Sequence, residues 1–134
     1  MSDATVNRDA LTPLSFLERT VRVFPDKTAV VYGDQRWSYR RFAEEVGTMA
    51  SALARAGVGP GDRVAFLAPN VPGLLAAHFA VPLLRAVLVA INTRLGSEEI
   101  RYILDHSGAC LLYTSPSPRD CNEYLVCRLL LEKG

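Results

Sequence analysis

Residues 57–70 read Gly-Val-Gly-Pro-Gly-Asp-Arg-Val-Ala-Phe-Leu-Ala-Pro-Asn, and residues 87–95 read Val-Leu-Val-Ala-Ile-Asn-Thr-Arg-Leu. The glycines and the proline that open the first stretch are typical of a turn. Each stretch contains an apolar run of a length that suits a buried strand. The chain between them predicts a helix, which Asn70 is suited to cap and which Pro82 should kink or end. Two strands joined through a helix form a right-handed parallel crossover, so the pattern predicts a parallel sheet buried on both faces.

The chain on either side of these stretches alternates between helical and strand patterns. Apolar side chains recur at helical spacing in some segments, and two short segments separated by Gly33 and Asp34 are typical of a hairpin. Ser38 suits an N-cap, and Gly57 suits a left-handed helix end. This alternation predicts an α/β layer fold. The further predicted elements are helices at residues 14–24 and 39–56, a helix capped by Ser97 and ended by Gly108, hairpin strands at residues 28–32 and 35–38, and a strand after Ala109.

Composition is that of an ordinary globular protein. The 134 residues are 49% hydrophobic, which is enough for a core, and the formal net charge is +1. A charge so near zero gives no indication of a nucleic-acid partner. The apolar run at residues 74–91 is interrupted by His78, Pro82 and Arg85, so we interpret it as a buried helix plus a strand and not as a transmembrane segment. Residues 2–9 lack the apolar centre of a signal peptide, so we expect a cytoplasmic protein.

Several phrases, read in order along the chain, carry a family resemblance. They are Thr12-Pro-Leu-Ser-Phe-Leu-Glu, Phe24-Pro-Asp-Lys-Thr-Ala-Val, Trp37-Ser-Tyr-Arg-Arg-Phe, Gly61-Asp-Arg-Val-Ala-Phe-Leu-Ala-Pro-Asn, Ala77-His-Phe-Ala-Val-Pro, Ile91-Asn-Thr-Arg-Leu and Glu99-Ile-Arg-Tyr-Ile-Leu-Asp-His-Ser-Gly-Ala. In order and spacing they resemble the N-terminal part of acyl-CoA synthetases, which are adenylate-forming, AMP-binding ligases.

The resemblance implies an α/β fold, namely the N-terminal part of the large adenylate-forming-enzyme domain, with a mostly parallel sheet flanked by helices. We assign residues 12–109 to this domain and residues 1–11 to a disordered leader. The implied function is that of a fragment of an ATP-dependent ligase that joins a medium- or long-chain fatty acid to CoA through an acyl-adenylate. The parent enzyme would use ATP, Mg²⁺ and CoA. This chain contains neither the family's phosphate loop nor its catalytic lysine, so we expect the fragment to be inactive.

One site residue carries over from the family. The family's Asn-x-Arg matches Asn92-Thr-Arg94, and the resemblance implies that Arg94 binds a phosphate of CoA, for which a guanidinium offers paired donors. The alternative is an ordinary surface arginine at a strand end. We predict no catalytic residue and no metal ligand in this chain. His78 lies on an apolar helix face, and we interpret it as a packed, hydrogen-bonded core histidine.

Two other functions remain open from the sequence. One is another adenylate-forming enzyme, either luciferase-like or amino-acid-activating. The other is a non-catalytic α/β binding module of the receiver type. A receiver needs acidic residues at its strand ends, and none directly follows Leu67 or Ile91. The sequence leaves the oligomeric state undecided.

Residues 110–134 differ in character from the rest of the chain. They hold all three cysteines, Cys110, Cys121 and Cys127, without the spacing of a zinc site or the even count of a disulfide framework. Residues 110–120 match the translation of a transposase-type sequencing adapter, and residues 125–134 match the translated flow-cell end of such an adapter. We therefore interpret residues 110–134 as a non-native read-through tail. The alternative is a loop followed by an apolar helix at residues 124–131.

Overall fold

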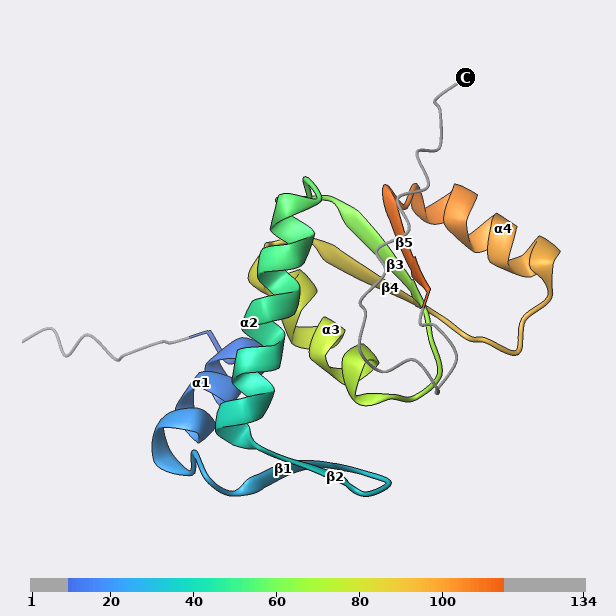
Figure 1. Ribbon diagram of the computed structural model, residues 1–134. Helices are drawn as coiled ribbons and strands as arrows, with labels where there is room; N and C mark the ends of the chain where they lie inside the picture. Colours follow the sequence, from blue (N-terminus) through green and yellow to red (C-terminus); the bar gives the residue numbers. More distant parts are fainter. Residues whose placement is uncertain (1–9, 115–134) are drawn as a thin grey trace, which may run out of the picture.

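The computed structural model describes residues 10–114, in which helices and strands follow one another in the predicted order (Figure 1). Most of the predicted leader and tail lies outside these residues. In chain order the elements are α1 (Pro13–Val23), β1 (Thr28–Tyr32), β2 (Gln35–Ser38), α2 (Tyr39–Arg55), β3 (Arg63–Leu67), α3 (Pro72–Leu83), β4 (Val87–Ile91), α4 (Ser97–Ser107) and β5 (Leu111–Thr114).

A three-stranded parallel sheet with the order β4-β3-β5 forms the centre of the fold. β3 pairs with β4 along its whole length and with β5 from Val64 onward. This confirms the predicted parallel crossover and the predicted strand after Ala109. The predicted hairpin is also present, because β1 and β2 form a separate antiparallel pair that turns at Gly33, where φ is 55°. Glycine adopts such a positive φ without steric cost.

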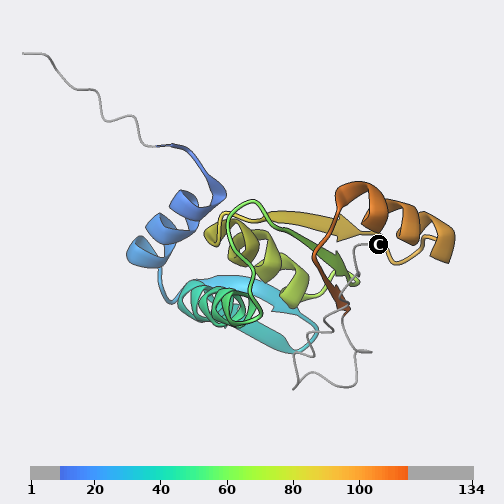
Figure 2. The ribbon, with the colours of Figure 1, turned by 90° about the horizontal axis from the view of Figure 1, so that it is seen from above.

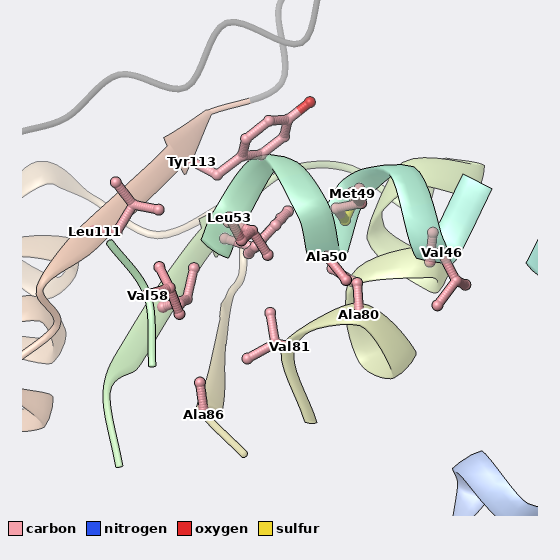
Figure 3. Packing of buried hydrophobic residues seen from close by; sticks show 14 of the residues in the cluster. Val46, Met49, Ala50, Leu53, Val58, Ala80, Val81, Ala86, Leu111 and Tyr113 are labelled. Carbon is pink, nitrogen blue, oxygen red and sulfur yellow. The ribbon is translucent and has the colours of Figure 1, made fainter. Parts of the chain in front are cut away.

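Helices cover both faces of the sheet, so the fold has three layers (Figures 1 and 2). α2 and α3 pack on one face, and α4 packs on the other. The larger core lies under α2 and α3. Its centre is Phe66 of β3, which is fully buried and stacks on the ring of Tyr113 at 4.6 Å between centroids. Figure 3 shows Leu111 and Tyr113 of β5 on the same side as Leu53 of α2.

Apolar side chains on one face of α2 and of α4 contribute to the two cores. The large core takes the inward face of α2, and the small core takes three partly buried residues of α4. Trp37 of the hairpin is buried in the large core, with the Arg41 guanidinium 5.2 Å from the centre of its ring. The α2 residues are Phe42, Val46, Met49, Ala50 and Leu53, and the α4 residues are Ile100, Ile103 and Leu104.

The prediction that His78 is packed in the core is wrong, although the predicted hydrogen bond is present. His78 is exposed, and its Nδ1 lies 2.8 Å from the carbonyl oxygen of Leu74. Leu75 is 43% exposed. α3 contains no charged Asp, Glu, Lys or Arg, and a helix that is apolar all round has no polar stripe to mark its outer face. Its buried face is formed instead by small side chains, namely Ala76, Ala77, Ala80 and Val81.

The predicted cap of α3 is also wrong. The N-cap is Val71, which makes no side-chain capping hydrogen bond, so Asn70 does not cap the helix. Pro72 occupies the first helical position, where its fixed φ suits the helix and its missing N–H needs no acceptor. Pro82 lies in the last turn, and the helix ends at the next residue, Leu83, as predicted.

The two serines predicted as N-caps have different outcomes. Ser38 caps α2, since its hydroxyl accepts a hydrogen bond from the N–H of Arg41 at 3.2 Å. Ser97 does not cap α4, because it is already the first helical residue and Gly96 is the N-cap. Glu99 supplies the polar partner here, with Oε2 accepting from the N–H of Gly96 at 2.8 Å. Gly108 ends the helix as predicted, with φ of 61°.

Burial of the sheet on both faces is only partly right. Val64, Ala65 and Phe66 of β3 are buried, whereas β4 lies at the edge of the described sheet and its Val87 is 53% exposed. None of the helices within residues 10–114 is long and apolar enough to cross a membrane. The apolar run at residues 74–91 forms α3 and β4, as expected.

Candidate functional site at the carboxyl edge of the sheet

The loops that follow β3 and β4 leave the sheet on the same side (Figure 1). Because the strands run parallel, with Leu67 opposite Ile91 and Thr114, the residues that come next emerge along one edge. Ligands of open parallel α/β sheets bind outside this edge, where the carboxyl ends of the strands lie. We call it the carboxyl edge. Its residues are Ala68, Pro69 and Asn70 after β3, and Asn92, Thr93 and Arg94 after β4.

Arg94, the predicted site residue, lies at this edge and is exposed. Its backbone N–H donates to Oδ1 of Asn92 at 3.0 Å, and the N–H of Leu95 donates to the Asn92 carbonyl oxygen at 3.3 Å. Within residues 10–114, no carboxylate forms an ion pair with the Arg94 guanidinium. The backbone of Arg94 is therefore held in a turn, while its charged group is available to a ligand.

Polar side chains at the carboxyl edge are left to solvent. Asn70, Thr93 and Thr114 are exposed, and no hydrogen bond in the described part of the chain joins the loop after β3 to the loop after β4. An arginine with neighbouring amide and hydroxyl groups suits an anion with several acceptor oxygens, such as a phosphate. The described residues bring Arg94 and these groups to one edge but add no acid or base beside them.

The opposite, amino edge contains an arginine that sequence reasoning missed. The guanidinium of Arg63 donates to the carbonyl oxygens of Ser107 at 3.1 Å, Gly108 at 2.8 Å and Gly61 at 3.1 Å. Two of these acceptors belong to the end of α4, where carbonyls lack helical partners and favour a cation. Ser107 and Gly108 are distant from Arg63 in sequence, so only the fold brings them together.

The described residues supply no site for Mg²⁺. No three side chains of His, Cys, Asp or Glu are grouped closely enough within residues 10–114 to hold a metal ion. His106 is exposed on α4 and stacks on Tyr102 at 5.6 Å between ring centroids. Magnesium prefers several carboxylate or phosphate oxygens in octahedral geometry, and these residues do not offer that set.

A parallel α/β sheet with helices on both faces, and with a cation and amides at its carboxyl edge, is typical of α/β proteins that bind nucleotides or related phosphates. The family described as AMP-binding enzyme matches residues 17–133. The chain therefore belongs to the AMP-binding enzyme family.

Curated relatives of this chain are named as CoA ligases. The chain is 48% identical over 97 residues to 4-hydroxybutyrate–CoA ligase 2 of Metallosphaera sedula, covering 72% of this chain and 18% of that protein. It is 40% identical over 106 residues to a peroxisomal acetate/butyrate–CoA ligase of Arabidopsis thaliana, covering 79% and 19%. The chain thus spans about a fifth of the length of these relatives.

Solved structures resemble the fold of this chain. Unliganded o-succinylbenzoate CoA synthetase from Bacillus subtilis matches 75% of this chain and 22% of its own, with a TM-score of 0.72 and 30% identity. The N-terminal domain of FACL13 from Mycobacterium tuberculosis matches 75% and 26%, with a TM-score of 0.72 and 32% identity. The N-terminal subdomain of NpsA from Klebsiella oxytoca matches 78% and 27%, with a TM-score of 0.73 and 25% identity. The expected fold is therefore confirmed as that of the N-terminal subdomain of these enzymes.

Proposed function

We propose that the complete protein is an ATP-dependent carboxylic acid–CoA ligase that acts through an acyl-adenylate, and that this chain is its N-terminal part. The 48% identity with a 4-hydroxybutyrate–CoA ligase is the observation that carries the proposal. Activation would join the carboxylate to the α-phosphate of ATP and release pyrophosphate. The thiol of CoA would then attack the acyl carbon and release AMP.

In this proposal the described residues supply a scaffold and one contact. Arg94 binds a phosphate of CoA from the carboxyl edge, where it is exposed and forms no ion pair with a carboxylate within residues 10–114. Two donors of one guanidinium match two phosphate oxygens, which makes arginine a better fit than lysine. ATP and Mg²⁺ would be held by other parts of the longer protein, so the 134-residue chain by itself is expected to be inactive.

The acid substrate is the finer part of the proposal. The family resemblance implies a medium- or long-chain fatty acid, whereas the relatives are named for acetate, butyrate and 4-hydroxybutyrate. These names favour a short acid. Comparing kcat/KM for carboxylic acids of two to sixteen carbons, with the enzyme made from the complete reading frame, decides between them, because each buried methylene changes binding by about 0.8 kcal/mol.

An amino-acid-activating or luciferase-like enzyme is the second candidate, favoured by the fold shared with the adenylation enzyme NpsA. The acceptor of the acyl group distinguishes the two. A CoA ligase forms an acyl-CoA product and releases AMP only when CoA is present. Acid-dependent pyrophosphate exchange without any acyl-CoA product would favour the second candidate.

Replacing Arg94 tests the proposed contact. Arg94→Ala in the complete enzyme is expected to raise KM for CoA about tenfold, the loss typical of a hydrogen bond to a charged group at an exposed site. Pyrophosphate exchange, which precedes CoA binding, should not change. Arg55→Ala is the matched control, since it removes an equal charge from the exposed end of α2. An unchanged KM for CoA in Arg94→Ala would refute the contact.

The interpretation of residues 110–134 as read-through remains a proposal. β5 (Leu111–Thr114) takes up the strand position expected after Ala109, and the family match extends to residue 133. The nucleotide sequence decides the matter: codons over residues 110–120 that differ from the adapter would end the proposal.

The cytoplasmic location also remains a proposal, and the peroxisomal names of several relatives make imaging of a tagged complete protein a useful test.

A further inference from the structure

Asn92 is the polar residue that fixes the start of the loop after β4. Its Oδ1 accepts the N–H of Arg94 at 3.0 Å, while its carbonyl oxygen accepts the N–H of Leu95 at 3.3 Å. The side chain of asparagine commonly closes a turn in this way, by binding its own backbone two residues on. Both bonds tie the backbone around Arg94 to Asn92, the first residue after β4.

The segment that carries Arg94 is anchored on both sides. Before the loop, Ile91 is 3% exposed and pairs with Leu67 of the central strand. After it, the N–H of Gly96 donates to Oε2 of Glu99 at 2.8 Å, which fixes the start of α4. Between these anchors, the Asn92 side chain makes the hydrogen bond that holds the backbone of Arg94 itself.

We propose that Asn92 is a positioning residue for Arg94, holding the loop so that the guanidinium points to one place outside the carboxyl edge. This inference rests on the proposed function, in which Arg94 binds a phosphate of CoA. A loop that is already ordered loses less conformational entropy when the ligand binds, so its contact is stronger. Asn92 need not touch CoA for this effect.

A double-mutant cycle in the complete enzyme tests the inference. Asn92→Ala is expected to raise KM for CoA about three- to tenfold, the range that corresponds to one net hydrogen bond, with kcat and pyrophosphate exchange unchanged. Asn92→Ser keeps a short neutral acceptor and should restore most of the affinity. In the Arg94→Ala background, Asn92→Ala should add no further effect, because the two residues would act through one contact. Ser97→Ala, which removes another exposed polar group from the same part of the chain, serves as control.

The outcomes separate this inference from the proposed function. If Arg94→Ala raises KM for CoA while Asn92→Ala leaves it unchanged, the CoA contact stands and the positioning role is refuted. Additive effects in the double variant would also refute it, because Asn92 would then act independently of Arg94. If Arg94→Ala has no effect on KM, the CoA contact itself fails. A general folding defect is recognised by a lower kcat and a lower melting temperature in Asn92→Ser as well, and this outcome also refutes the positioning role.

Discussion

The two edges of the parallel sheet use their polar groups in opposite ways. At the amino edge, hydrogen bonds join different segments of the chain. The N–H of Val87 donates to the carbonyl oxygen of Asp62 at 2.7 Å, and the N–H of Gly61 donates to the carbonyl oxygen of Arg85 at 2.9 Å. Arg63 adds its three hydrogen bonds to carbonyl oxygens. At the carboxyl edge, by contrast, the hydrogen bonds described for the two loops stay within each loop.

This difference separates polar groups that stabilise the fold from polar groups that are left to solvent. Polar groups that are satisfied inside the protein hold elements together, and they offer little to a ligand. Polar groups that face water at the carboxyl ends of parallel strands remain able to bind one. Arg63 and Arg94 are thus two exposed arginines in different settings. The guanidinium of Arg63 is hydrogen-bonded at the amino edge, and that of Arg94 forms no ion pair within residues 10–114 at the carboxyl edge.

The largest expected effect comes from Arg63→Ala. Three carbonyl oxygens lose a charged donor, and two of them lie at the C-terminal end of α4. Because the site is solvent-accessible, water replaces part of the loss, and we expect a destabilisation of about 2–3 kcal/mol. Thermal or denaturant unfolding of the complete enzyme measures it. KM for CoA should not change.

Arg63→Lys sharpens the test. It keeps the charge near the end of α4 but cannot offer the same fork of donors, so less than half of the lost stability should return. If Arg63→Ala instead raised KM for CoA without lowering stability, the assignment of Arg63 to the stability of the fold would be wrong.

A smaller effect is expected for Gly108→Ala. Gly108 has φ of 61°, and an added Cβ would lie 3.0 Å from Nη2 of Arg63. An L-residue in this left-handed conformation costs about 1–2 kcal/mol. Gly96→Ala is the matched control at the other end of α4, since Gly96 has φ of −72° and its added Cβ would lie 3.7 Å from Oε2 of Glu99.

Unfolding free energies of the four combinations of Gly108→Ala with Arg63→Ala isolate the steric part. In the double variant the contact with Nη2 of Arg63 is gone. The stability lost by the double variant should therefore be smaller than the sum of the losses of the two single variants. Equal losses for Gly96→Ala and Gly108→Ala would mean that backbone conformation does not distinguish the two ends of α4.

Most of the fold could be predicted from local patterns. Phe42, Val46, Met49 and Leu53 repeat at the spacing of one helix face, and they form the buried side of α2. The pattern failed on α3, where every side of the helix is apolar and no polar stripe marks the solvent. There, the alanines pack closely against neighbouring elements and leave Leu75 and His78 outside.

The site could be predicted only in part, for a similar reason. Arg94 was found because it directly follows an apolar strand within a phrase that resembles a family motif. Arg63 was overlooked because its acceptors Ser107 and Gly108 follow it by 44 and 45 residues. Local sequence carries information on caps and turns, whereas a contact of this range depends on which strands become neighbours in the sheet.

The smallest effect is expected at Tyr113 of β5. This residue is buried, unlike the exposed polar residues of the carboxyl edge such as its neighbour Thr114. Burial raises the pKa of the Tyr113 hydroxyl above its usual value of 10.0, because the phenolate is poorly solvated there. The folded-state pKa is thus higher than the unfolded one, so this contribution to stability is complete below pH 10 and is lost as pH rises through the folded-state pKa.

Tyr113→Phe should therefore flatten the fall in melting temperature of the 134-residue chain as the pH rises above about 10, where an ordinary tyrosine ionises. The ring contact with Phe66 needs no hydroxyl, so stability at neutral pH should change little. Tyr102→Phe is the control, because Tyr102 is 66% exposed. If Tyr102→Phe reduced the fall in melting temperature at alkaline pH as much as Tyr113→Phe, the burial of Tyr113 against the sheet would be contradicted. The carboxyl edge would then be exposed to solvent at all three strands.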